Sequence, residues 1–426
     1  MQILSAADVS RFDRCYQPSA AVAETVNEVI GAVRRRGDAA LLEFAEKFDR
    51  ARFSHVREMV VPPGEFEDAE ARVDGESRAA IRASLENVTA FAARSKRTDW
   101  RASNAQGAEV GEIFQPFDRV GIYVPGGTAP LVSTVNMTVG IAKAAGCESI
   151  VVCTPPGPDG KLNDAMLHAL RAAGAGEVWK LGGAQAIAAL AFGSETLRPV
   201  QKIFGPGNAY VMEAKRQVFG AVAVDLLPGP SEILVLADDS ARPAWIAADL
   251  LAQAEHGGDS VAILVSDSQT LLDAVLAEID RQASTLSRQA PLRSVLEKNC
   301  TLVKVDTMEE GVSLANAFAP EHLSLVSRRE AELLPLIRTA GAIFAGPYSP
   351  VAAGDFLAGP SHELPTGGAC KGFAGLTVDQ FQRRTGFVRL DRESLARSLP
   401  VIEAFARIEG LDAHGRSASI RLDGVS

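Results

Sequence analysis

The sequence has few of the features that would place it in a membrane, outside the cell or on nucleic acid. None of its apolar stretches reaches the roughly 18 residues that a membrane helix needs. Residues 1–5 lack the charged and apolar regions of a secretory signal. The net charge of −10 disfavours nucleic-acid binding, because phosphate contacts need a dense Lys/Arg surface. We therefore expect a soluble, cytoplasmic protein that binds neither a membrane nor nucleic acid.

Cysteine is also scarce, and its spacing excludes two kinds of site. The five cysteines are scattered along the chain, without a Cys-x-x-Cys pair, as Cys15, Cys147, Cys153, Cys300 and Cys370. This spacing gives neither a disulfide framework nor a zinc site made of thiolates. Any metal ligands must therefore be His, Asp, Glu or amide side chains.

Hydrophobic periodicity divides the chain into a helical start and an alternating remainder. Residues 1 to about 118 are expected to be mainly helical, with helices at 21–36 and 39–48. From Arg119 onward, short Val/Ile-rich runs alternate with Ala-rich helical stretches. The expected strands are 120–124, 149–154, 178–181, 232–236, 261–266, 301–305, 322–326 and 342–344. The expected helices between them are 133–145, 162–173, 184–192, 208–219, 245–256, 271–284, 308–318 and 329–338.

This alternation predicts an α/β fold class with parallel, doubly wound sheets covered on both faces. Two consecutive sets of strands and helices indicate two α/β domains, and we expect the active site in the crevice between them. After about Leu376 the alternation fades into a short, mostly helical tail.

Glycine-rich turns follow several expected strands, although the Gly-x-Gly-x-x-Gly dinucleotide fingerprint is absent. The four turns are Pro125-Gly126-Gly127-Thr128, Gly182-Gly183-Ala184-Gln185, Gly205-Pro206-Gly207-Asn208 and Pro228-Gly229-Pro230-Ser231. Glycine lets backbone amides approach an anion closely, and a helix N-terminus adds favourable partial charge. Ordinary turns of an α/β protein are the alternative interpretation. Because three of the four open into helices, the set also fits binding of a phosphate or a nucleotide.

Four of the six histidines lie in the C-terminal half, beside other polar groups; the six are His55, His168, His256, His322, His362 and His414. Gln253 and His256 are three residues apart on an expected helix, so both side chains can converge on one point. We expect this helix to end at His256, with Gly257 as a left-handed cap. The alternative is a histidine that only satisfies the last carbonyl groups of its helix.

Glu321 and His322 follow Pro320 at the start of an expected strand. Adjacent strand residues point to opposite faces, so both reach one site only at a strand end or bend, which the proline favours. A carboxylate paired with an imidazole suits general base catalysis near neutral pH. A surface Glu-His pair is the alternative.

Residues 352–368 are too rich in glycine and proline for a core element, so we expect a loop over the carboxyl edge of a sheet. Asp355 offers an oxygen ligand there and His362 an imidazole, while Glu409 and His414 add a carboxylate and an imidazole in the tail. Together Gln253, His256, Asp355 and His414 supply two nitrogen and two oxygen donors, a set that suits zinc or a similar divalent ion.

At these residues the sequence resembles the histidinol dehydrogenase family. The matching stretches run in order over nearly the whole chain: IYVPGG at 122–127, FGPGNAYV at 204–211, GPSE at 229–232, QAEH at 253–256, PEHL at 320–323, GPSH at 359–362, LPTGG at 364–368, and EGL at 409–411 with His414. Such an ordered set is far more specific than any single motif.

The resemblance implies a homodimer with two Rossmann-like domains and small helical extensions at both ends. Residues 1–20 would form the N-terminal extension, and residues 21–121 with 237–376 a discontinuous first domain that carries the metal and catalytic residues. Residues 122–236 would form the second domain, on the NAD side. Residues 377–426 would form a helical tail that completes the partner subunit's site.

The resemblance also implies a role for each matching residue. The implied zinc ligands are Gln253, His256, Asp355 and His414. His322 is implied as the general base and Glu321 as the residue that activates water. The implied substrate contacts are Ser231, His362 and Glu409, in addition to the ligands and His322. The implied NAD contacts are Tyr123, Gln185 and Asn208. The implied reaction is a four-electron oxidation of L-histidinol through L-histidinal to L-histidine with two NAD⁺.

Two departures from the family pattern lie beside the expected substrate loop. Glu363 stands where an apolar residue is expected, and residues 369–373 differ from the commoner small, Arg-containing run. They favour one alternative, a paralogous zinc- and NAD-dependent dehydrogenase acting on another small polar alcohol. Another alternative is a nucleotide-binding protein without catalytic activity, in which the histidine cluster is incidental.

Overall fold

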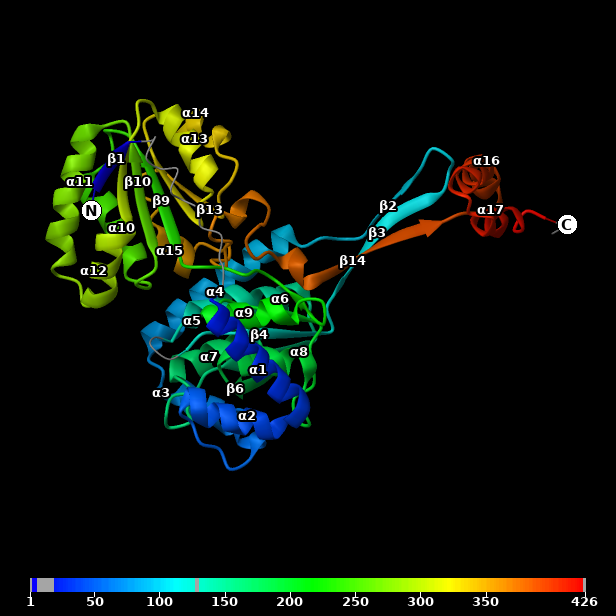
Figure 1. Ribbon diagram of the computed structural model, residues 1–426, viewed down its shortest axis with the longest axis horizontal. Coiled ribbons are helices and arrows are strands. Elements are labelled where there is room, and N and C mark those ends of the chain that lie inside the picture. Colours follow the sequence, from blue (N-terminus) through cyan, green and yellow to red (C-terminus); the bar gives the residue numbers. More distant parts are fainter. Residues whose placement is uncertain (1, 6–18, 127–129, 424–426) are drawn as a thin grey trace.

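The computed structural model describes residues 2–5, 19–126 and 130–423 as two α/β lobes and a projecting arm (Figure 1). Each lobe is built around a parallel sheet, which confirms the α/β fold class. Cys15, most of the expected N-terminal extension, and Gly127 and Thr128 of the first glycine turn lie outside the described residues. Among the described residues, no helix has the length and apolar character needed to cross a membrane.

The first sheet forms the upper lobe in Figure 1 and has the strand order β1-β11-β10-β9-β12-β13. Its strands are β1 (Gln2–Ser5), β9 (Glu232–Ala237), β10 (Val261–Ser266), β11 (Cys300–Lys304), β12 (His322–Val326) and β13 (Ala342–Ala345). Every residue of β9 and β12 is buried, as expected for apolar strands covered on both faces. One face packs against α10 (Pro243–Ala254), α11 (Gln269–Ala283) and α12 (Gln289–Lys298), and the other against α13 (Met308–Phe318) and α14 (Glu330–Leu333).

The second sheet forms the lower lobe and has the order β6-β5-β4-β7-β8. Its strands are β4 (Arg119–Tyr123), β5 (Ser149–Thr154), β6 (Glu177–Lys180), β7 (Lys202–Phe204) and β8 (Ala223–Val224). One face packs against α1 (Ala20–Arg36), α2 (Asp38–Phe44), α8 (Gly183–Phe192) and α9 (Ala209–Val218). The other face packs against α3 (Pro63–Arg72), α4 (Gly75–Ser95), α5 (Val132–Val135), α6 (Ile141–Ala145) and α7 (Asp164–Ala173).

The assignment of residues 21–121 to the first domain is wrong. The apolar faces of α1 and α2, including Val26, Val33 and Leu41, are buried in one core with the second sheet and α8. The first sheet instead gains a strand from the N-terminus, because β1 pairs in parallel with β11. The N-terminal extension therefore contains a strand, where the sequence predicted helix.

The arm contains three strands that the sequence analysis missed. They form the antiparallel sheet β14-β3-β2, made of β2 (Trp100–Ser103), β3 (Glu109–Pro116) and β14 (Gln382–Arg389). The expected tail helices are present as α16 (Arg392–Glu409) and α17 (Asp412–Ser419), at the far end of the arm (Figure 1). All four residues of β2 are exposed, so these strands lack the alternation of apolar and polar residues by which a sequence reveals a half-buried strand.

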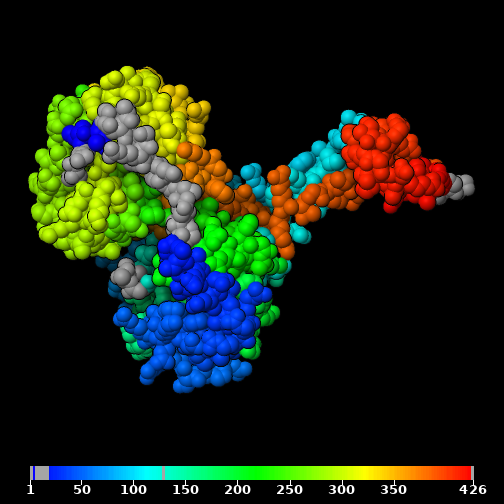
Figure 2. Space-filling model, in the orientation of Figure 1, coloured from blue at the N-terminus to red at the C-terminus, as the bar shows by residue number. Residues whose placement is uncertain are grey.

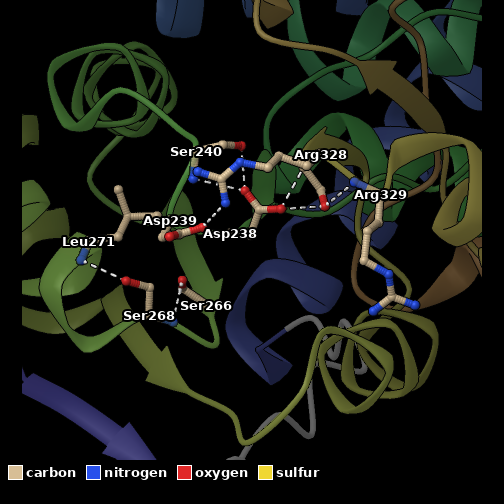
Figure 3. Close-up of polar contacts among 9 residues, drawn as sticks. Asp238, Asp239, Ser240, Ser266, Ser268, Leu271, Arg328 and Arg329 are labelled. Atoms are coloured by element: carbon tan, nitrogen blue, oxygen red, sulfur yellow. Dashed lines mark hydrogen bonds and ion pairs between the residues drawn. The ribbon is translucent and has the colours of Figure 1, made fainter.

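In the second sheet the first strand, β4, lies in the middle, with the next two strands on one side and the last two on the other. In the first sheet β9 holds the same place relative to β10–β13, and β1 is added at the edge. In such sheets, ligands bind beside the first strand, in the crevice at the carboxyl ends where the strand order reverses. In the first sheet, Asp238 bridges this crevice between β9 and β12 (Figure 3). Its carboxylate accepts hydrogen bonds from the Ser327 hydroxyl at 2.7 Å and the Arg328 amide at 2.9 Å. The usual ligand position of this sheet is therefore occupied by the chain's own side chains.

Candidate active site

A cleft of about 490 Å³ lies between the two lobes, which are seen in contact in Figure 2. The turns after β4 and β7 form one wall, where Gly126 and Gly207 line the cleft. The turn before β9, the start of β12 and the segment that follows α15 (Val351–Phe356) form the other wall, with Ser231, His322 and His362. The glycine-rich turns thus lie opposite the polar residues singled out in the sequence.

The polar residues of the first sheet lie at its amino edge. Glu321 directly precedes β12, Glu232 is the first residue of β9, and the amide of Gly367 donates to the Glu232 carboxylate at 3.1 Å. The prediction that residues 352–368 cover a carboxyl edge is therefore wrong for this sheet. The prediction of a continuous loop is also wrong, because Asp355 lies within the short helix α15.

His322 is buried at the start of β12 with one ring nitrogen anchored. Its Nδ1 lies 2.9 Å from the carbonyl oxygen of Glu232, so Nδ1 carries the proton and donates. Its Nε2 is buried, has no hydrogen-bond partner among the described residues, and lies 3.7 Å from Asp355 Oδ1. Burial lowers the pKa of His322, an effect that the charge of Asp355 opposes. The ring is therefore neutral at pH 7, with Nε2 available as a proton acceptor.

Glu321 is a second buried acid–base group beside this ring. Its Oε2 accepts a hydrogen bond from the Glu232 amide at 2.7 Å and lies 3.6 Å from His322 Nδ1. Burial raises the pKa of Glu321 well above its usual range, and the negative charges of Glu232, Asp355 and Glu363 raise it further. Carboxyl groups crowded in this way favour the binding of a cation, because a positive charge relieves their mutual repulsion.

His362 connects the two lobes across the cleft. Its Nδ1 lies 2.9 Å from the carbonyl oxygen of Asp355, and its Nε2 lies 3.2 Å from the Thr134 hydroxyl of α5 and 3.4 Å from Glu363 Oε1. Burial lowers the pKa of His362, but the hydrogen bond and charge of Glu363, together with the charge and backbone carbonyl of Asp355, outweigh burial, so the pKa is raised. Glu363, the residue that departs from the family pattern, is therefore a direct partner of an expected substrate contact.

Two of the four expected zinc ligands, His256 and Asp355, line the cleft. Gln253 is buried near the end of α10, and its Nε2 has no hydrogen-bond partner among the described residues. The helix ends at Ala254, before the predicted position, and Gly257 does not adopt a left-handed conformation. In the described part of the chain, no three His, Cys, Asp or Glu side chains are placed to hold a metal ion. A metal held here by three or more side chains would therefore need a donor other than His, Cys, Asp and Glu of the described residues, such as the amide oxygen of Gln253.

The two site residues expected in the tail do not reach this cleft. Glu409 ends α16 and His414 lies in α17, both exposed at the far end of the arm (Figure 1). The same helices expose large apolar side chains, with Phe405 58% and Ile408 75% exposed. An exposed apolar surface on a projecting arm is typical of a segment that packs against another protein molecule.

The three residues expected to contact NAD lie along the carboxyl edge of the second sheet. Tyr123 ends β4, and its buried hydroxyl accepts a hydrogen bond from the Gly183 amide at 3.1 Å. Gln185 is buried in the first turn of α8. Asn208 caps α9, where its side-chain oxygen accepts from the amides of Tyr210 and Val211. Tyr123 and Asn208 follow β4 and β7, the strands between which the strand order of this sheet reverses, and Gln185 lies after β6 along the same edge.

Gly205 is the described glycine of the β4/β7 crevice at which an added Cβ would meet the closest neighbour. Its φ is +107°, and a Cβ would lie 2.0 Å from the Tyr123 carbonyl oxygen. We expect Gly205→Ala to destabilise the fold by about 3 kcal/mol or more, since left-handed strain adds to a backbone clash. The matched control is Gly220→Ala, because Gly220 has φ +98° but no neighbouring atom of the described residues within 4 Å. If thermal unfolding showed that both variants lose the same stability, the predicted clash with the Tyr123 carbonyl would be contradicted.

Comparison with known proteins decides the family. The family model described as histidinol dehydrogenase matches residues 13–422. The histidinol dehydrogenase of Geobacillus kaustophilus is 45% identical over 398 residues, which cover 93% of each chain. That of Geobacter metallireducens is 43% identical over 403 residues, covering 95% of this chain and 92% of that one. The crystal structure of histidinol dehydrogenase from Elizabethkingia anophelis superposes with a TM-score of 0.94 at 34% identity, over 99% of this chain and 96% of that chain.

The chain belongs to the histidinol dehydrogenase family. This membership confirms the resemblance stated from the sequence. It also confirms the assignment to NAD-dependent oxidoreductases and to histidine biosynthesis. The fold found in the solved histidinol dehydrogenase is the one described above.

Three residues of the histidinol dehydrogenase cleft and its surroundings were missed in the sequence. Thr134 reaches His362 from α5, Glu232 anchors both Glu321 and His322, and Asp49 contacts Gln185. Glu232 was part of a recognised motif, GPSE, so its position was available as a signal. Thr134 and Asp49 carry no local signal, because each meets its partner only through the tertiary fold.

Proposed function

We propose that this chain is a zinc-dependent, NAD-linked dehydrogenase that oxidises L-histidinol to L-histidine through L-histidinal, as a cytoplasmic homodimer. The observation that supports the proposal best is the neutral His322 ring, whose free Nε2 lies in a cleft opposite the glycine-rich turns. This arrangement suits an enzyme that removes a proton from one side of a carbon centre and a hydride from the other.

The first oxidation requires a base and a hydride acceptor. His322 Nε2 takes the proton of the substrate hydroxyl, while the Nδ1–H bond to the Glu232 carbonyl holds the ring in the required tautomer. Bound NAD⁺ would supply the acceptor for the hydride of the carbinol carbon. Tyr123, Gln185 and Asn208 are the proposed NAD contacts on the opposite wall.

Gln253, His256, Asp355 and His414 from a second copy of the chain are the proposed zinc ligands. The donor set fits, because it combines two imidazoles, a carboxylate and the amide oxygen of Gln253, and the crowded carboxyl groups around Glu321 favour a cation. Bound zinc would orient the substrate and polarise its reacting oxygen. Substrate contacts from Ser231, His362, and Glu409 of the second copy complete the proposed site.

The homodimer is proposed from the arm. Within one subunit His414 is exposed on α17 at the far end of the arm, remote from the cleft that His256 and Asp355 line. The apolar residues exposed on α16 would be buried if the arm packed on a partner. Light scattering should therefore give twice the mass of the 45.0 kDa chain; a monomer with full activity would contradict this proposal.

Glu321 is proposed to act in the second oxidation, in which water adds to the aldehyde. Its carboxyl group lies beside His322 and accepts the Glu232 amide, so it is held in place for proton transfer to and from water. We expect Glu321→Gln, which keeps this hydrogen bond, to lower the rate of histidinal oxidation by about 10²-fold or more. Histidinol oxidation to the aldehyde should fall less than about tenfold. Stopped-flow rates of histidinol and histidinal oxidation test whether the second reaction is slowed more. If both rates fell by the same factor, Glu321 would have no specific role in the second step.

The test of the proposed function is the stoichiometry of the reaction. With zinc and NAD⁺ present, we expect two NADH for each histidinol consumed, with histidine as the product. One NADH per substrate, or faster turnover of another polar alcohol, would instead favour the paralogous dehydrogenase. Glu363 is the observation behind that second candidate, because it adds a buried carboxylate to the substrate side of the cleft.

A further inference from the structure

Asp49 places a carboxylate from the N-terminal helices against the second sheet. It ends the π-helical turn η2 (Ala45–Asp49), which follows α2, and lies more than a hundred residues before α8 in the sequence. Its Oδ2 accepts hydrogen bonds from the Gly182 amide at 3.1 Å and from Gln185 Nε2 at 3.3 Å. One oxygen of Asp49 therefore holds both the start of α8 and the Gln185 side chain.

The start of α8 is shaped around this carboxylate. The N-cap residue, Gly182, has no side chain with which to cap the helix, so Asp49 supplies the acceptor from a distant segment. A Cβ at Gly182 would lie 2.5 Å from Asp49 Oδ1, which means that a larger residue here would displace Asp49. The glycine turn and the carboxylate are complementary in shape as well as in charge.

Asp49 also determines which way the Gln185 amide points. An ionised carboxylate can only accept, so Gln185 must direct its amino group at Asp49. The carbonyl oxygen then lies on the other side, where a Cβ added to Gly183 would be 2.7 Å from it. In this orientation Gln185 can offer its oxygen, but not its nitrogen, to a ligand.

We infer that Asp49 is a positioning residue of the cofactor site, which fixes Gln185 so that its carbonyl oxygen meets NAD⁺. The inference rests on the proposed function. It specifies the part of the cofactor at Gln185: a hydrogen-bond donor, such as a ribose hydroxyl or the adenine amino group, and not a phosphate oxygen.

Isothermal titration with NAD⁺ tests the inference without relying on turnover. Burial raises the pKa of Asp49 to about 6, so titrations at about pH 8 keep the carboxylate ionised. We expect Asp49→Ala to raise Kd about tenfold and Asp49→Asn, which retains an accepting oxygen, to raise it less than about threefold. The matched control is Glu46→Ala, because Glu46 is an exposed acid of the same turn that bonds to Arg52; its Kd should not change.

A double-mutant cycle separates positioning from a general structural effect. If Asp49 acts through Gln185, the double variant Asp49→Ala/Gln185→Ala should bind NAD⁺ no more weakly than Gln185→Ala alone. Additive losses would overturn the inference.

A second pair of variants remains informative if the alanine variants fail to fold. Gln185→Glu places a second carboxylate next to that of Asp49, and the repulsion between the two should weaken NAD⁺ binding. Adding Asp49→Asn should restore binding, since the asparagine amide can donate to the new carboxylate in the reversed bond. Absence of this rescue would overturn the inference. Failure of the unaltered protein to bind NAD⁺ would instead overturn the proposed function.

Discussion

Replacing His322 with Asn is expected to lower kcat for histidinol oxidation by about 10³-fold, because a positioned general base contributes about 10²- to 10⁴-fold. Asn can still donate to the Glu232 carbonyl from its side-chain amide, so the start of β12 should keep its structure. Nε2, which is the proposed proton acceptor, is lost. We expect the variant to keep its zinc and its thermal unfolding temperature, so that the loss appears in kcat alone.

The control for this variant is His55→Asn, which makes the same substitution at an exposed histidine. His55 accepts from the Arg57 amide at the start of η3 (Val56–Met59), a capping role that Asn also fills. Its kcat should match that of the unaltered protein. Near-normal turnover by the His322 variant would show that another group accepts the proton.

Replacing His414 with Asn is expected to remove zinc and abolish activity, although His414 is remote from the cleft of its own subunit. If His414 completes the site of a second copy, two inactive variants should complement each other. In a mixed dimer of His414→Asn and His322→Asn chains, one cleft combines an intact His322 with an intact His414. Co-expression in equal amounts should therefore restore about a quarter of the active sites, since half of the dimers are mixed and each has one intact cleft.

Complementation distinguishes a shared site from a tail that folds back onto its own subunit. Each variant alone should remain inactive, and only the mixture should regain activity. Because His322→Asn keeps its zinc, the zinc content of the mixture measured by atomic absorption should equal the mean of the two separate variants. An inactive mixture of properly folded dimers would contradict a ligand contributed across the interface. Retention of zinc by His414→Asn alone would remove His414 from the ligand set.

Most strands of the two sheets could be predicted from the sequence because they are buried runs of Val and Ile between amphipathic helices. The short strands β1, β7 and β8 were missed. β5, β10 and β12 were found at their observed bounds. The arm could not be predicted in this way. β2 and much of β14 are exposed, and β3 pairs with β14 across about 270 residues of chain, so the sequence of these strands carries little periodic signal.

The domain partition failed for a related reason. The periodicity of an amphipathic helix such as α1 shows that one of its faces is buried. It does not show which sheet that face packs against. The sequence placed them with the first sheet, whereas they cover the second. The site residues were easier to predict than the domain boundaries, because residues such as His322 and Asp355 lie in recognisable motifs. Their joint position depends on the amino edge of the first sheet facing the carboxyl edge of the second, which no local pattern encodes.

The central claim is that Gln253, His256 and Asp355 of one subunit and His414 of another surround one divalent cation beside His322. Anomalous diffraction at the zinc absorption edge, from crystals of the dimer grown with zinc, tests this claim most directly. The account predicts one peak per cleft, within about 2.0–2.3 Å of these four side chains. A peak at other residues, or full activity in crystals that lack any peak in the cleft, would contradict it.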